Sequence, residues 1–185
     1  MKKRINKHIE KKDFVKVYLA DHNGIDLTKF SGILFDQNEE FVLLCAFSDF
    51  RYDGFVVFSK SDISEIQKEQ NEDFYYKILA AEGIIESVTE QYNTLNFELG
   101  SHREMFDSLK TRGMSVIVEN LYIEKNVFLI GPIFETKKKK VFIDYINARG
   151  EYDLKPTAID YKNITFFSFD DRYSSMYLKY SKRVD

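Results

Sequence analysis

An internal repeat constrains this sequence more than any other feature. Shifting the chain against itself by 99 residues places the segment from Gly32 to Asp36 over the segment from Gly131 to Glu135. Few positions are identical, but both segments share one pattern: a glycine, apolar residues, a Phe followed by an acid, and a polar turn into a further apolar run. Because such self-similarity marks duplicated units, we expect two copies of one small fold.

The segments before the strands agree with this duplication. Ser101 and Glu104 have the spacing of a capping box, in which each side chain satisfies a free amide at the start of a helix, and an apolar stripe follows them. At the same offset, residues 2–13 carry Ile5 and Ile9 four positions apart, which is helical spacing. We therefore expect each copy to begin with a helix.

Five short apolar runs separated by turn signals follow each helix, and they predict antiparallel strands. In the first copy they span residues 14–20, 30–36, 40–48, 54–59 and 62–67. In the second copy they span residues 114–119, 127–134, 140–147, 152–160 and 162–169. The signals for chain reversal in the first copy are Asn23-Gly24, the polar segment 36–40, and Tyr52-Asp53-Gly54.

Five short strands with tight turns do not bury two faces as a flat sheet, so we expect each sheet to bend into a small barrel. Gly32 and Gly131 each lie inside a strand pattern, where a strand can bend sharply or let another backbone approach. The predicted fold class is mainly β with helices, an α+β protein of two repeated units, each an N-terminal helix plus a bent five-stranded antiparallel barrel.

The domain organisation follows from the repeat. We expect a first helix-plus-barrel unit over residues 1–72, a connecting helical segment over 73–100, and a second unit over 101–185. The connecting segment has apolar residues at helix-compatible spacing and an expected break near Gly83. The tail after Asp170 resembles the entry to this connecting segment, so the repeat extends beyond the fifth strand.

Composition supports a globular, mostly β protein. The 185 residues include 17 Phe and 12 Tyr but no Trp and only two Pro, and bulky aromatic side chains fill β-rich interiors. The single cysteine, Cys45, excludes an internal disulfide, the polar amino terminus lacks an apolar signal core, and no apolar run is long enough to span a membrane. A reducing, cytoplasmic location is expected.

The order of a helix and five bent strands resembles the Sm-like fold. The residues that carry the resemblance are Gly32 to Asp36 with the run 42–44, and Gly131 to Glu135 with the run 141–143. Sm-like proteins usually assemble into rings and bind uridine-rich RNA through two turns: an Asn or Asp after the second strand, and a basic turn before the fifth. The resemblance therefore implies a tandem Sm-like protein, and a generic SH3-like barrel fits the same pattern.

The two turns depart from the Sm-like RNA-binding pattern. Glu39-Glu40 and Lys139-Lys140 occupy the first turn of the two copies, while Ser61-Asp62 and Lys162-Asn163 occupy the second. These departures weaken the inference of RNA binding more than they weaken the inference of an Sm-like fold.

No motif in the sequence indicates catalysis. The three histidines, His8, His22 and His102, have no metal-ligand spacing, and Cys45 lies among apolar residues as a small core side chain would. There is no phosphate-binding glycine loop and no nucleophile elbow. We expect a protein that is not an enzyme and has no catalytic residue, no cofactor and no metal.

Charge is distributed unevenly along the chain. The formal net charge is −3, but residues 1–16 hold seven basic and two acidic residues, a local charge of +5. Four consecutive lysines in the second copy create another positive turn, which attracts phosphate or acidic protein or keeps an edge turn soluble. The candidate contacts for a partner protein or RNA are therefore Lys3, Arg4, Lys7, Lys137, Lys138, Lys139 and Lys140.

These observations favour a binding or assembly module that engages another protein, with a second copy of the chain as one candidate partner. RNA binding by the Sm-like route is the alternative, and an enzyme of unknown reaction is a residual alternative. No membrane partner is expected.

Overall fold

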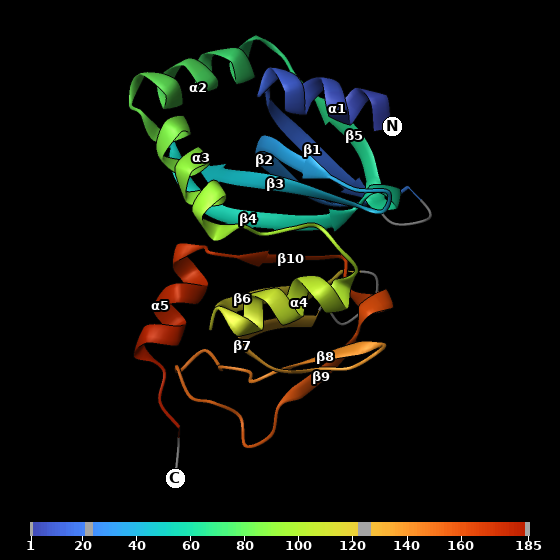
Figure 1. The fold of residues 1–185 in the computed structure, drawn as a ribbon, viewed down its shortest axis with the longest axis vertical. Helices are drawn as coiled ribbons and strands as arrows, with labels where there is room; N and C mark the ends of the chain where they lie inside the picture. Colours follow the sequence, from blue (N-terminus) through green and yellow to red (C-terminus); the bar gives the residue numbers. More distant parts are fainter. Residues whose placement is uncertain (1, 21–23, 122–126, 184–185) are drawn as a thin grey trace. The chain divides into compact units, whose positions relative to one another are not determined.

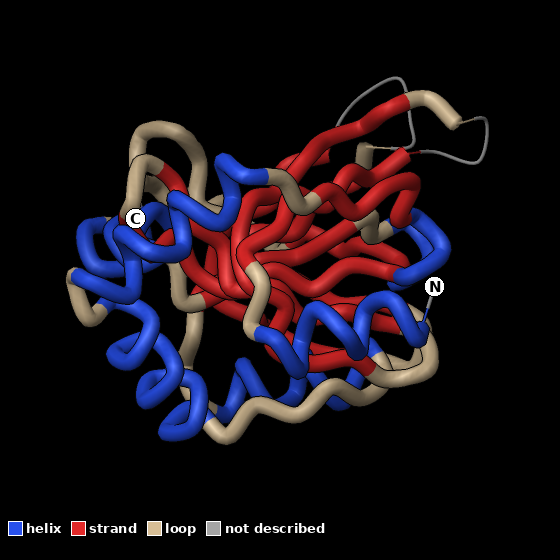
Figure 2. The backbone as a smooth tube through the Cα atoms, turned by 90° about the horizontal axis from the view of Figure 1, so that it is seen from above, coloured by secondary structure: helices blue, strands red, loops and turns tan. Residues whose placement is uncertain are grey.

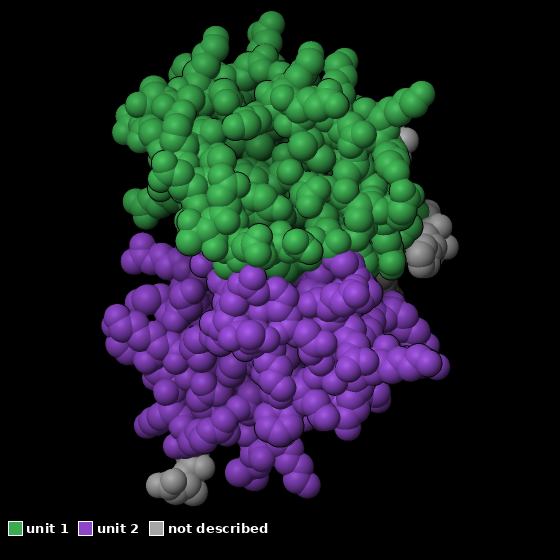
Figure 3. Space-filling model, in the orientation of Figure 1, with its two compact units in different colours: residues 1–99 green, residues 100–185 purple. Residues whose placement is uncertain are grey.

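The computed structural model describes residues 2–20, 24–121 and 127–183. The chain divides into two compact units, residues 1–99 and residues 100–185 (Figure 3). Each unit combines helices with an antiparallel sheet (Figure 1), so the chain is an α+β protein. The segment 73–100, expected to connect two units, is grouped mostly with the first.

Unit 1 begins with a helix, continues with five strands and ends with two helices. Its elements are α1 (Lys2–Lys11), β1 (Phe14–Ala20), β2 (Asp26–Gln37), β3 (Phe41–Ser48), β4 (Arg51–Ser59), the 3-10 turn η1 (Lys60–Asp62), β5 (Ile63–Gln67), α2 (Gln70–Ala81) and α3 (Ile84–Leu95). The expected helix break is present, because Gly83 adopts a left-handed conformation (φ 69°) between α2 and α3.

The strands of unit 1 pair in the order β5-β1-β2-β3-β4. Helix α1 packs against β2 and helix α2 against β1. The fully buried side chains of the unit include Ile5, Val17, Leu44 and Phe55. Cys45 is buried as well, as its sequence neighbours predict.

Unit 2 has the same order of elements as unit 1, except that one helix follows its fifth strand where unit 1 has two. Its elements are α4 (His102–Thr111), β6 (Ser115–Asn120), β7 (Val127–Thr136), β8 (Lys140–Ile143), β9 (Thr157–Asp160), the 3-10 turn η2 (Tyr161–Asn163), β10 (Phe166–Phe169) and α5 (Arg172–Tyr180). The expected capping box is present, since Ser101 accepts a bond from the Glu104 amide and Glu104 accepts one from the Ser101 amide. Helix α4 packs on β7 and β8, and α5 on β6 and β7.

The strands of unit 2 pair in the order β10-β6-β7-β8-β9. When strands are numbered within each unit, both sheets have the order 5-1-2-3-4. The strands curve along their length (Figure 2).

The expected barrels are not closed. Among the described residues, β4 does not pair with β5 and β9 does not pair with β10, because the fifth strand of each unit pairs with the first strand. The fifth strands are short, with five and four residues. Each sheet is therefore open within its unit.

Several strand ends and turns also differ from expectation. In unit 1 the chain reverses at Asp49 and Phe50, which both have positive φ (47° and 62°), whereas Tyr52 and Asp53 lie inside β4. Two central residues with positive φ form the type I′ turn that joins twisted strands. In unit 2 the regular strands β8 and β9 are much shorter than expected. Residues 144–156 form a long connection with two isolated bridges, between Ile146 and Tyr152 and between Glu151 and Lys182. The expected reversal at Asn23-Gly24 lies partly outside the described residues.

Candidate functional site

The four expected contact lysines of unit 2 lie at the turn between β7 and β8, but two of them are engaged locally. The Lys137 ammonium is 3.2 Å from a Glu135 carboxylate oxygen and 5.0 Å from the centroid of the Phe142 ring. The Lys140 ammonium is 3.7 Å from an Asp160 carboxylate oxygen. Lys138 and Lys139 are exposed and form no ion pair with a described residue. The turn therefore presents two uncompensated charges, fewer than its sequence indicates.

The three expected contacts in α1 have two different roles. Lys3 and Lys7 are exposed on the helix surface. Arg4 instead donates a hydrogen bond from Nη2 to the main-chain carbonyl of Ile66 in β5, at 2.6 Å. These residues belong to unit 1 and the lysine turn belongs to unit 2, so neither unit contains all seven expected contacts.

The terminal strands β5 and β9 are the second feature of interest, because each has a neighbour on one side. Among the described residues, β5 pairs with β1 alone and β9 with β8 alone. Ser64 and Glu65 in β5 and Ala158 in β9 are exposed. An edge strand presents unpaired amide and carbonyl groups that can add a further strand.

The lysine turn lies next to β9. The Tyr161 amide, immediately after β9, donates to the Lys139 carbonyl at 3.0 Å, and Lys140 pairs with Asp160 in the β8–β9 ladder. Lys138, Lys139 and Lys162 are all exposed in this region. The end of β9 is therefore an electropositive edge.

The two units carry opposite charge. Unit 1 has 12 basic and 18 acidic residues, a formal net charge of −6, and unit 2 has 15 basic and 12 acidic residues, a net charge of +3. The basic segment 1–16 is thus an exception within an acidic unit. Surfaces of opposite charge on two molecules attract each other during association.

The β5 edge stands beside a buried polar network. The Asp13 carboxylate, 8% exposed, receives hydrogen bonds from the Lys68 ammonium at 2.7 Å and from His8 Nδ1 at 2.9 Å. Burial alone raises the pKa of Asp13, but the bonds from Lys68 and His8 outweigh it, so the pKa lies below its ordinary value. The Lys16–Glu72 pair, at 2.7 Å, lowers the pKa of Glu72 in the same way against a desolvation cost. These contacts fix α1, β1 and α2 around β5.

The histidines do not converge on a common site. His8 belongs to the Asp13 network, whereas His102 stacks on Tyr161 in unit 2, with ring centroids 5.3 Å apart. Burial lowers the pKa of His102 to about 4. His22 lies outside the described residues. In the described part of the chain, no group of three or more His, Cys, Asp or Glu side chains has the arrangement needed to hold a metal ion.

Sequence reasoning missed two features that matter for binding. Arg4 contacts a carbonyl far along the chain, and no local pattern predicts which backbone group an arginine will reach. A pocket above β2 also went unpredicted, because it depends on the placement of α1 and α3 on two sides of that strand.

No family model matches this chain, and neither a curated protein nor a solved structure matches it. In the described ranges, no helix is both long and apolar enough to cross a membrane.

Proposed function

We propose that this chain is a non-enzymatic assembly module made of two Sm-like units, and that its partner is another copy of itself. In this proposal β9 of one molecule adds to β5 of the next. The single observation that carries it is that each of these strands has a sheet neighbour on one side only among the described residues.

Three matched features support a duplicated unit. Both sheets have the strand order 5-1-2-3-4. The register of β2 against β3 shifts between Leu34 and Asp36, and that of β7 against β8 shifts between Ile133 and Glu135, 99 positions later. A helix packs on the second strand of each unit. Agreement in strand order, bulge position and helix contact is expected of two copies of one fold.

Charge supports a head-to-tail contact over a symmetric one. Two β9 edges would bring Lys138, Lys139 and Lys162 of one molecule toward the same lysines of another, which is repulsive. Contact between β9 and β5 instead brings these lysines toward a strand that carries the exposed Glu65, in a unit whose net charge is −6. A head-to-tail contact is heterologous, so it produces a ring if the rotation closes and a filament if it does not.

Sedimentation velocity of the full chain across a range of concentrations tests the proposal. We expect species larger than the 21.9 kDa chain that grow with concentration and shrink as salt is added, because screening weakens the attraction. Ala158→Glu places a negative charge on the β9 edge, which faces the acidic unit in this contact, and should reduce association. Ala148→Glu adds the same charge in the exposed loop before β9 and is the matched control. A single species of one chain at every concentration and salt would contradict the proposal.

RNA binding is the second candidate, and it is favoured by the exposed Lys138 and Lys139. Binding of a labelled oligouridine, followed by fluorescence anisotropy, should weaken steeply with salt if phosphate contacts contribute. Replacing the four lysines 137–140 by Glu should then abolish it. No anisotropy change at low salt would eliminate this candidate.

A further inference from the structure

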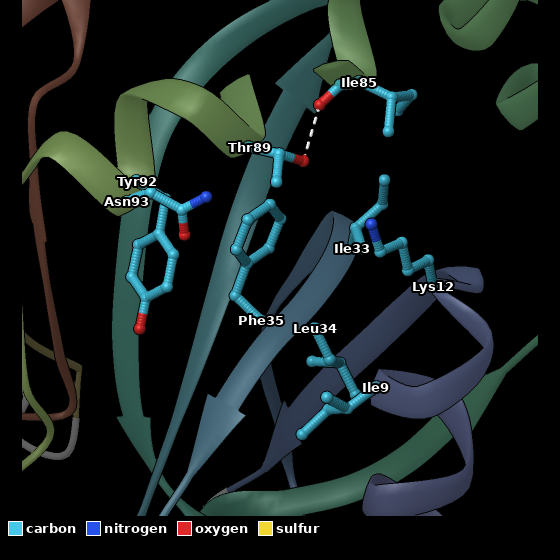
Figure 4. Close-up of a pocket in the computed structure, with 9 residues that line it drawn as sticks. All are labelled: Ile9, Lys12, Ile33, Leu34, Phe35, Ile85, Thr89, Tyr92 and Asn93. Carbon is cyan, nitrogen blue, oxygen red and sulfur yellow. Dashed lines mark hydrogen bonds between the residues drawn. The ribbon is translucent and has the colours of Figure 1, made fainter. Parts of the chain in front are cut away.

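The pocket above β2 in unit 1 is a partly open hollow lined by three elements that are distant in sequence (Figure 4). Strand β2 forms its floor, α1 closes one side and α3 the other. Its apolar lining consists of Ile9, Ile33, Leu34, Phe35, Ile85 and Tyr92. Unlike the terminal strands, this surface faces the helices of the unit.

The size of the pocket limits what it can hold. Its volume is about 210 Å³. An apolar protein cavity of about 150 Å³ binds benzene, whereas sites for drug-sized ligands occupy roughly 300–1,000 Å³. The pocket therefore fits one ring or one branched aliphatic group with a short substituent.

The polar groups around the pocket differ in availability. The Thr89 hydroxyl donates to the Ile85 carbonyl at 2.7 Å, as the dashed line in Figure 4 shows. The Tyr92 hydroxyl donates to the Phe97 carbonyl at 3.4 Å. By contrast, the Lys12 ammonium and the Asn93 amide form no side-chain hydrogen bond with a described residue, and both residues are exposed.

Of these two available groups, Lys12 selects the charge of a ligand, because an ammonium donates hydrogen bonds and cannot accept them. The Asn93 side chain is neutral, and its NH₂ group can donate one further hydrogen bond. A carboxylate accepts only, and its bonds to charged donors are the stronger kind. A polyanion is disfavoured because unit 1 carries a net charge of −6 and only one lysine lines the pocket.

We propose that this pocket binds a small monocarboxylate whose apolar part is the size of one aromatic ring or one branched aliphatic group. The apolar part lies among Ile33, Phe35 and Ile85, and the carboxylate pairs with Lys12 and Asn93. This chemistry occurs in free arylalkanoic acids and at the carboxyl terminus of a peptide ending in Phe or Leu. The site is independent of the terminal strands, so it stands whether or not the chain assembles.

The test uses calorimetric titration of the full chain with 3-phenylpropionate, together with amide and methyl NMR shifts. We expect saturable binding at millimolar concentration, with shifts at Thr89 and in α1. The uncharged analogue 3-phenylpropan-1-ol should bind about tenfold more weakly, because it lacks a charge-assisted hydrogen bond. Acetyl-glycyl-phenylalanine, compared with its carboxamide, distinguishes a peptide terminus from a free acid: tighter binding of the peptide acid than of phenylpropionate assigns the site to peptides.

Two variants test the apolar pocket and the charged contact separately. Thr89→Leu fills the pocket and should abolish binding of the acid and the alcohol. Lys12→Asn removes the charge, and asparagine tolerates the positive φ of this residue, 50°. The acid and the alcohol should then bind this variant with equal affinity. Lys11→Gln removes an exposed charge outside the lining and should change neither. Thermal melting verifies that each variant is folded.

Three binding results would each overturn the assignment. They are the absence of saturable binding, equal binding of acid and alcohol by the unaltered chain, and binding that survives in folded Thr89→Leu. Shifts confined to residues outside α1, β2 and α3 would place the ligand elsewhere and would also refute it.

Discussion

The Cys45 carbonyl oxygen occupies the space in which a side chain on residue 32 would begin. A Cβ built on Gly32 would lie less than 3.0 Å from that oxygen, closer than real Cβ contacts. The Asp144 carbonyl oxygen meets Gly131 in the same way, 99 residues later. The repeated glycine thus permits a close approach between the second and third strands of each unit.

Gly32→Ala should destabilise the protein strongly. The new methyl group meets the Cys45 backbone and not a flexible side-chain end, so β2 or β3 must move. Overpacking of this kind typically costs about 1–3 kcal/mol. Chemical denaturation followed by circular dichroism measures the loss. Ser31→Ala, at the half-buried neighbouring position, is the control, and an equal loss in both variants would refute the steric explanation.

Phe35→Ala and Phe134→Ala should have unequal effects although both residues lie at the repeated bulge. Phe35 packs edge-on against Phe55 and Tyr92, with centroids 5.8 and 5.1 Å away, whereas Phe134 is 54% exposed. We expect a loss of about 2 kcal/mol for the half-buried Phe35 and less than about 0.5 kcal/mol for Phe134. Urea unfolding of the two variants measures both, and equal losses would contradict this description of their environments.

Some features of the fold could be predicted from the sequence because local backbone geometry determines them. Gly32 and Gly131 mark the same close approach, and the capping box at Ser101 and Glu104 marks a helix start by local hydrogen bonding alone. The different environments of Phe35 and Phe134 could not be predicted from the aligned pattern, since that pattern carries no information on the position of α3. Tyr92 of α3 covers Phe35, and no segment in the aligned half of the sequence signals that difference.

The candidate site was predicted in part. The lysine turn was located from composition, but its pairing with Glu135 and Asp160 depends on cross-strand register. The shortness of β9 also escaped prediction, because the apolar residues of 144–156 resemble a strand in sequence while the chain there forms a loop. The lysine ion pairs and the shortness of β9 both depend on contacts between residues that are distant in sequence, so no local sequence pattern predicts them.

Arg4→Ala should increase self-association if the chain assembles through β5. Arg4 donates to the Ile66 carbonyl, and a carbonyl on an edge strand is an acceptor that an added strand can use. Removing the guanidinium frees that acceptor and should shift the sedimentation profile toward larger species at the same concentration. Lys7→Ala, which removes one exposed positive charge from the same helix, is the control for charge. Unchanged or weaker association in Arg4→Ala would argue against β5 as the contact strand.

Asp13→Asn should lower the free energy of unfolding at neutral pH. It should also make that free energy fall less when the solution is acidified. Because the pKa of Asp13 is depressed in the folded protein, its contribution is present above the unfolded pKa of 3.8 and is lost as pH falls through the folded value. Loss of the charged hydrogen bond to Lys68 should cost about 2 kcal/mol at pH 7. Asp73→Asn removes the more exposed partner of the same lysine and should cost much less. Denaturant titrations at pH 7 and pH 3 compare them, and a loss that persists unchanged at pH 3 would be inconsistent with the linkage.

His102→Phe should flatten the pH dependence of stability between pH 6.5 and about 4. Burial lowers the pKa of His102 from 6.5 to about 4, so across this interval the unfolded chain binds a proton that the folded chain does not. Stability therefore falls as the pH decreases, by at most about 3 kcal/mol. Phenylalanine preserves a ring against Tyr161, 5.3 Å away, but does not titrate. The melting temperature of both proteins, recorded from pH 7 to pH 4, measures the difference. Because Asp13 titrates below this interval, parallel curves for the two proteins would show that His102 is not the group responsible.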